Sequence, residues 1–271
     1  MNVRPPCVSG QFYEENAERL RKQVEGCLPK EPKQKREAKA LVVPHAGLMY
    51  SGKVAGEVYA SISWPQTVLF LGPNHTGEGK PVSLSTAAKW RTPLGDVEVD
   101  RELVRTLLDH APELEEDDEA HRFEHSLEVQ LPFLQLLSRQ TKIVPIVLGF
   151  GTPERYKAFG HHLAKAIEVS KKKVIVVASS DMTHYESHQE AMEKDLFAVQ
   201  AILAVDPEEL ARRVKERQIS MCGVAPTLAM LSYVRKRNGA QGELIRYQTS
   251  GDVTGDRSSV VGYAGILIRS S

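Results

Sequence analysis

Three histidines closely follow apolar runs of this sequence: His45 follows residues 40–43, His75 follows residues 68–71, and His184 follows residues 174–177. Continuous apolar runs are typical of strands buried on both faces of a sheet. The carboxyl ends of parallel strands form the crevice in which open α/β sheets bind ligands, so we expect these imidazoles to meet at one sheet edge. Each histidine alone would more often be an ordinary loop residue, but their recurrence favours a shared cleft. Imidazole is the commonest metal ligand, and two imidazoles with one anionic group leave positions open for water, substrate or dioxygen.

Asp181 stands three residues before His184 on the segment that follows the third run. At this spacing the carboxylate is close enough to orient the imidazole as a general base or as a partner of a metal site. The alternative is that the two side chains only close a loop by hydrogen bonding. We interpret Asp181 and His184 as candidate catalytic residues.

Cys222 lies in a short apolar turn that opens a predicted helix. A helix N-terminus lowers the pKa of a thiol and favours the thiolate, which binds metals and attacks carbon. The alternative is a small buried apolar residue. Cys7 and Cys27 have no comparable setting, and three widely spaced cysteines favour reduced thiols over a disulfide framework.

His125 lies directly before Ser126, which we expect to be the N-cap of a helix over residues 126–138. By itself this pattern is an ordinary helix start with exposed charges.

The elements that must position these residues alternate along the chain. Besides the three runs above, residues 143–148 and 260–268 are expected strands. Helical spacing recurs over residues 52–61, 101–110, 126–138, 153–169, 188–205, 207–218 and 225–237, with Asp100 and Asp206 as expected N-caps. This alternation predicts an α/β fold, a three-layer sandwich with a central mostly parallel or mixed sheet flanked by helices, and we expect one domain over residues 1–271. Residues 29–37 are predicted to form a solvated connection, and residues 247–259 are either a hairpin loop or a pocket rim.

The charge balance excludes several classes of partner. Lys+Arg and Asp+Glu both number 35, so no net positive field would recruit nucleic acid or an anionic membrane. The first residues have no apolar segment of the signal-peptide kind, and no apolar run approaches the roughly 20 residues of a membrane span. We therefore expect a cytoplasmic protein.

Several ordered motifs, which together span essentially the whole chain, resemble the Memo family, whose prokaryotic members are called AmmeMemoRadiSam system protein B. The motifs are Arg4-Pro5-Pro6, Ser9-Gly10-Gln11-Phe12-Tyr13, Pro44-His45-Ala46-Gly47, Tyr50-Ser51-Gly52, Leu71-Gly72-Pro73-Asn74-His75, Thr92-Pro93-Leu94-Gly95, Glu124-His125-Ser126-Leu127-Glu128-Val129-Gln130-Leu131-Pro132, Ser179-Ser180-Asp181 with His184, and Cys222-Gly223. The family is similar in fold to the class III extradiol dioxygenases, in which two histidines and a glutamate bind Fe(II).

The resemblance implies that His45, His75 and Cys222 are metal ligands, with the cysteine in place of that glutamate. It also places His184 where the dioxygenases keep an acid/base histidine, and suggests that His125 lines the same cleft. A thiolate is softer than a carboxylate and shifts the preference towards Cu(I) or Zn, which puts ring cleavage in doubt.

The implied function is therefore a metal-dependent, oxidoreductase-like activity on an unknown substrate, with iron as the first expectation and copper or zinc as the others. Two alternatives stay open: zinc-dependent hydrolysis, and a non-catalytic module whose cleft binds a peptide. The prokaryotic family name implies association with a radical-SAM protein and an AMMECR-type protein.

Overall fold

The computed structural model describes residues 2–31, 33–235 and 239–270. Its main sheet has the strand order β10-β12-β2-β9-β3-β8-β4-β7, and β11 also pairs with β12. The strands are β2 (Ala40–Val43), β3 (Thr67–Pro73), β4 (Val82–Leu84), β7 (Glu115–Glu116), β8 (Lys142–Leu148), β9 (Val174–Ser179), β10 (His184–Glu186), β11 (Ala240–Thr249) and β12 (Val260–Ser270). The central strands β2, β9, β3 and β8 are mutually parallel, whereas β12 pairs antiparallel with β2 and β4 antiparallel with β8.

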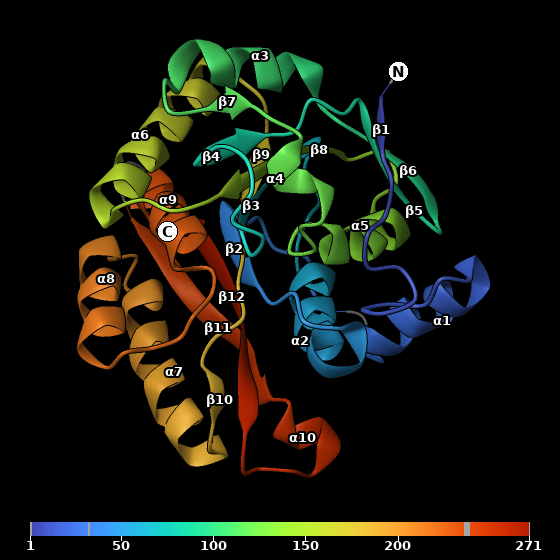
Figure 1. Ribbon diagram of the computed structural model, residues 1–271, viewed down its shortest axis with the longest axis vertical. Helices are drawn as coiled ribbons and strands as arrows, with labels where there is room; N and C mark the ends of the chain where they lie inside the picture. The colour runs from blue at the N-terminus through green and yellow to red at the C-terminus, as the bar shows by residue number, and fades with distance from the viewer. Residues whose placement is uncertain (1, 32, 236–238, 271) are drawn as a thin grey trace.

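Helices cover both faces of this sheet (Figure 1). On one side lie α1 (Ala17–Cys27), α2 (Leu48–Ala60) and α5 (Leu131–Leu137), which contact one another. On the other side α9 (Val224–Arg235) packs on the central strands, with α6 (Pro153–Ser170) against it and α3 (Arg101–His110) beyond, while α7 (His188–Leu203) packs on β11 and β12 and contacts α8 (Pro207–Glu216). The predicted three-layer α/β sandwich with a mixed sheet is confirmed.

Every residue of β2, β3 and β9 is buried, which is why these segments read as continuous apolar runs. Shorter elements surround the sheet: a small second sheet of β1 (Val3–Arg4), β5 (Lys89–Thr92) and β6 (Gly95–Glu98), the helices α4 (Glu119–Arg122) and α10 (Gly251–Thr254), and the 3-10 helix η1 (Glu128–Gln130). None of the helices in the described part of the chain is long and apolar enough to cross a membrane.

The predicted caps are mostly confirmed. Asp100 accepts a hydrogen bond from the Leu103 N–H, and Asp206 accepts one from the Glu209 N–H with Pro207 as the first helical residue. The helix predicted over 225–237 is α9, and its expected last residues, 236 and 237, lie outside the described residues.

The helix predicted over residues 126–138 is shorter than expected, and Ser126 is not its N-cap. The segment divides into η1 and α5, and the residue before α5 is Gln130. The Ser126 hydroxyl donates instead to the carbonyl oxygen of Pro73 at 3.3 Å. Ser126 therefore attaches this segment to the end of β3, a contact between distant residues that local sequence does not reveal.

Residues 247–249 belong to β11, and residues 250–259 connect it to the antiparallel strand β12 and contain the short helix α10. The segment therefore forms the connection of a β-hairpin, and its role as a pocket rim stays a prediction. A strand before this segment was expected, but its bounds were not predicted, because the charged and polar residues of β11 interrupt the apolar pattern of a buried strand.

Candidate metal centre

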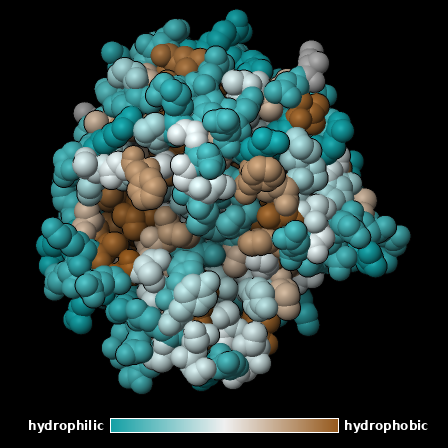
Figure 2. All heavy atoms as spheres, viewed as in Figure 1, coloured by the Kyte–Doolittle hydropathy of each residue, from teal (hydrophilic) through white to brown (hydrophobic). Residues whose placement is uncertain are grey.

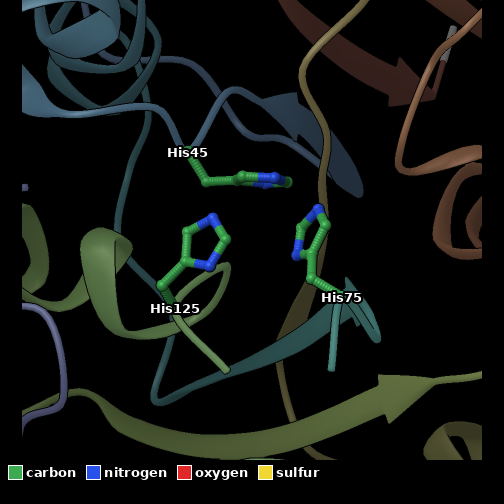
Figure 3. Close-up of side chains that lie close together, drawn as sticks. All are labelled: His45, His75 and His125. Atoms are coloured by element: carbon green, nitrogen blue, oxygen red, sulfur yellow. The ribbon is translucent and has the colours of Figure 1, made fainter. Parts of the chain in front are cut away.

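Three histidines converge at the carboxyl end of the central strands. His45 follows β2 and His75 follows β3, while His125 comes from the turn between α4 and η1. One ring nitrogen from each can be chosen so that all three lie within 4.8 Å of one another. The ring centroids are 5.2 Å apart for His45 and His75, and 4.7 Å apart for His75 and His125. The three imidazoles point towards a common space (Figure 3).

His45 is buried and held by neutral groups on its ring. Its Nδ1 lies 2.9 Å from the Ser179 hydroxyl, at the end of the neighbouring strand β9. Its main-chain N–H donates to Asp181 Oδ1 at 2.8 Å. Burial holds the pKa of His45 well below its ordinary value, and repulsion from a positive charge on His125 or His75 lowers it further. The imidazole is therefore neutral near pH 7, which is the form that binds metals.

His75 is held by a carboxylate. Its Nδ1 lies 3.0 Å from Glu124 Oε1, and its main-chain N–H donates to Glu124 Oε2 at 2.6 Å. Burial lowers the pKa of His75, but the hydrogen bond and negative charge of Glu124 outweigh it and raise the net value. Burial likewise opposes ionisation of Glu124, but His75 and His125 lower its pKa to about 2. An ionised carboxylate only accepts, so Nδ1 of His75 carries a proton and, in the neutral ring, Nε2 keeps its lone pair for a metal.

Cys222 lies beside this cluster, two residues before α9. Its Sγ is 3.3 Å from His45 Nε2 and accepts the Asp181 N–H at 3.2 Å. Gly223 makes this approach possible, because a Cβ on it would stand 2.3 Å from the Cβ of Ser180. The prediction of a lowered thiol pKa is wrong: burial and the nearby Asp181 carboxylate raise the pKa of Cys222 well above its ordinary value. A bound cation would have to displace the thiol proton.

His184 and Asp181 have partners other than each other. The His184 N–H donates to Ser220 Oγ at 2.8 Å, and Nδ1 lies 2.9 Å from the Ser220 carbonyl oxygen. A carbonyl only accepts, so Nδ1 of His184 is protonated and Nε2 is free in the neutral ring. Asp181 is buried and accepts the His45 N–H, and burial raises its pKa to about 6. The structure thus pairs Asp181 with His45, whereas the spacing had suggested a pair with His184.

Several residues that sequence reasoning missed hold these side chains. They are Glu124, which binds His75; Ser179 and Gln130, which lie behind His45; and Ser220, which binds His184. Glu124, Gln130 and Ser179 all stand in the motifs that carry the family resemblance, and Glu124 has a further signal because it directly precedes His125.

A buried ion pair supports the segment that carries Glu124 and His125. Arg4, in β1, pairs with Glu128, and its guanidinium donates to the Glu124 carbonyl at 2.7 Å. The same guanidinium lies 4.3 Å from the centroid of the Trp90 ring. The Phe12 ring lies 4.7 Å from that of His125. The N-terminal segment of the chain is therefore part of the construction of the site.

The donor set fits a transition metal. His45 and His75 are both bonded through Nδ1, which leaves Nε2 for coordination, and His125 and Cys222 stand beside them. Imidazole nitrogens suit iron, copper and zinc, whereas magnesium and calcium prefer oxygen ligands. These residues therefore suit an ion such as iron, copper or zinc.

Comparison with known proteins supports one family. The family model described as "Memo-like protein" matches residues 4–267. A protein described as "MEMO1 family protein" from Sulfurisphaera tokodaii is 42% identical over 97% of this chain and 98% of its own. Proteins of the same description from Aquifex aeolicus and Methanosarcina mazei are 43% and 42% identical, over 98% and 99% of this chain and 99% and 100% of theirs.

A solved structure shares the fold at low sequence identity. The crystal structure of uncharacterized protein JW3007 from Escherichia coli K12 matches with a TM-score of 0.57 and 12% identity, over 85% of this chain and 100% of that one. This likeness concerns the fold alone.

Proposed function

This chain belongs to the Memo family, and on that premise we propose that it binds one redox-active metal ion, iron in the first place, and uses it in an oxidoreductase-like reaction on a small ligand. The observation that carries the proposal is the convergence of His45, His75 and His125 beside Cys222. We assign His45 and His75 as the nitrogen ligands of the metal and Cys222, which lies beside His45, as its anionic ligand. His125 completes the histidine group and offers a further nitrogen ligand. An iron ion held in this way would supply redox chemistry and open coordination positions for exogenous ligands.

We assign His184 to proton transfer rather than to metal binding. It is partly exposed, and Ser220 holds its ring through Nδ1, so Nε2 is free to take up a proton from a ligand in the cleft. Asp181 is a buried carboxylate that fixes the backbone of His45. We propose that His184 exchanges the proton and Asp181 keeps His45 in place.

Exposed apolar side chains on the same segments favour a ligand with apolar surface. Met49, Phe123 and Tyr185 are 64%, 65% and 80% exposed, and they lie within four residues of His45, His125 and His184 respectively. Figure 2 shows a face that is mostly hydrophilic, with several apolar areas, the widest of them in a hollow at the left of the view.

Metal analysis of anaerobically purified protein tests this proposal. We expect wild type to retain iron, and Cys222→Ser to bind it at least tenfold more weakly, because a bound metal ion displaces the proton of a thiol far more readily than that of a hydroxyl. The iron form should bind nitric oxide and give the paramagnetic signal of that adduct, and His184→Ala should keep the signal. Protein that retains zinc and shows no redox activity would favour hydrolysis, and protein that retains no metal would favour peptide binding.

A further inference from the structure

We propose that Gln130 and Ser179 are positioning residues that fix the imidazole of His45 with its proton on Nδ1, so that the lone pair of Nε2 faces the other candidate ligands. The purpose of this arrangement rests on the metal site proposed above. The arrangement itself follows from the hydrogen bonds that link Gln130, Ser179 and His45, because the donor of each bond can be assigned.

The side-chain amide of Gln130 has one permitted orientation. Gln130 is fully buried, and its amide nitrogen donates to the Pro44 carbonyl oxygen at 3.0 Å. A carbonyl oxygen only accepts, so the nitrogen of the amide must face Pro44. The amide oxygen accepts the Tyr59 hydroxyl at 2.7 Å. The second amide N–H donates to Ser179 Oγ at 2.9 Å.

The hydroxyl proton of Ser179 is also placed by its neighbours. Ser179 Oγ lies 2.7 Å from the carbonyl oxygen of Ser126, which can only accept, so the hydroxyl donates there. Gln130 occupies one lone pair of the same oxygen. The second lone pair is left for His45 Nδ1, which lies 2.9 Å away. Ser179 has no second proton to donate, so Nδ1 of His45 must be the donor.

A neutral imidazole carries one proton, so His45 Nε2 is left with its lone pair. This atom faces the Sγ of Cys222 at 3.3 Å, on the side where the histidines converge. The same amide that orients Ser179 also binds the carbonyl of Pro44, the residue before His45. Gln130 therefore fixes both the backbone that carries His45 and, through Ser179, its tautomer.

Tyr59 provides a matched control. It is buried and donates to the far side of the Gln130 amide. In Tyr59→Phe the amide is still oriented by Pro44, so Ser179 and His45 keep their protons where they are. A purely structural role for this network would make Tyr59→Phe and Ser179→Ala alike in every readout, whereas positioning of the tautomer separates them.

The first test is nitrogen NMR of the metal-free wild type labelled at its histidines. The shifts of the two ring nitrogens show directly which one carries the proton. We expect His45 to be protonated on Nδ1 in wild type and in Tyr59→Phe, and no longer to be held in one tautomer in Ser179→Ala. A proton on Nε2 of His45 in wild type would overturn the inference without any variant.

The second test measures the affinity for zinc(II) by competition with a chelator. Loss of a side chain that orients a metal-ligating histidine typically costs 10- to 100-fold in metal affinity, and we expect this loss in Ser179→Ala and in Gln130→Met. Ser179→Thr keeps the hydroxyl and should restore most of the affinity, and Tyr59→Phe should retain it. Wild-type affinity in folded Ser179→Ala would overturn the inference, and Gln130→Met tests it independently if Ser179→Ala does not fold.

The two tests separate this inference from the proposed function. Wild type that binds no metal, but has His45 protonated on Nδ1, would refute the metal site and retain the hydrogen-bonded arrangement. Wild type that binds zinc but has His45 protonated on Nε2 would retain the metal site and refute the inferred tautomer.

Discussion

His45 and His75 hold matching positions after two strands of one sheet, yet their Nδ1 atoms meet opposite surroundings. Neutral groups, Ser179 with Gln130 behind it, hold His45, whereas an ionised carboxylate, Glu124, holds His75. Both arrangements leave the lone pair of Nε2 available to a metal, and that of His45 faces Cys222. They differ in electrostatics: burial lowers the pKa of His45, whereas Glu124 raises that of His75.

The comparison shows that a histidine can be oriented through Nδ1 either by a neutral hydroxyl or by a charged carboxylate. The charge of this partner decides how readily the histidine takes up a proton in acid. His45 resists protonation because burial disfavours its charged form and positive charges on the neighbouring histidines repel it. His75 takes up a proton more readily, and a proton competes with a metal for the imidazole. Acid release of the metal should therefore begin at His75.

The largest effect on the free energy of unfolding is expected from breaking the Arg4–Glu128 ion pair, which supports the segment that carries Glu124. Arg4→Met leaves Glu128 buried without its cation, and breaking a buried pair in this way costs about 3–5 kcal/mol in the free energy of unfolding. Denaturant unfolding measures this loss. Arg91→Met is the control, since its pair with Asp96 is exposed and should contribute little. Equal effects of the two variants would contradict the assignment of Arg4 as a structural support.

The next largest effect is a loss of metal affinity on replacement of Glu124, the carboxylate that holds His75. Glu124→Gln should weaken zinc binding by about 10- to 100-fold, because the neutral amide no longer raises the basicity of His75 and keeps only one of the two oxygens that bind it. A competition titration at pH 7.5 measures the change. If folded Glu124→Gln bound zinc as tightly as wild type does, the negative charge of Glu124 would be unimportant for metal binding.

A smaller effect is expected in the pH dependence of the metal-free protein. The folded-state pKa of His75 is raised, so its stabilisation is fully present below its unfolded-state pKa, about 6.5, and is lost as the pH rises through the folded-state value. The difference in free energy of unfolding between wild type and His75→Gln should therefore grow as the pH falls from 8.5 to 6. A difference that shrank over this range would show that Glu124 does not stabilise the imidazolium.

The smallest change in zinc affinity is expected from replacing Cys7, a thiol that contacts Arg4. Burial raises the pKa of Cys7 to about 11, and its Sγ accepts from Arg4 at 3.2 Å. A serine hydroxyl can accept the same hydrogen bond, so Cys7→Ser should keep the zinc affinity within about threefold, less than 1 kcal/mol. A loss as large as that expected for Cys222→Ser would mean that the metal site extends to Cys7.

The sequence predicted the positions of His45 and His75 well because they depend on a strong local signal. Each follows a fully buried strand, and β2, β9 and β3 are parallel neighbours, so the ends of these strands necessarily meet. Cys222 was recognised through the family resemblance, and the structure brings it to His45.

The supporting residues could not be predicted in the same way. Gln130 and Ser179 become partners only when η1 is laid against the end of β9, and a glutamine in an apolar helical segment gives no sign of that contact. The pKa of Cys222 was misjudged for a similar reason. The helix position is local, whereas the burial and the Asp181 charge that raise the thiol pKa come from the tertiary fold.

The place of β12 in the sheet has a consequence for synthesis on the ribosome. β12 pairs with β2, β10 and β11, and it is the last strand of the described chain to be translated, whereas β2 is among the first. Until β12 emerges, one edge of the apolar β2 has no neighbour and can pair with strands of other chains. We therefore expect variants cut before β12 to expose this edge and to accumulate as aggregates.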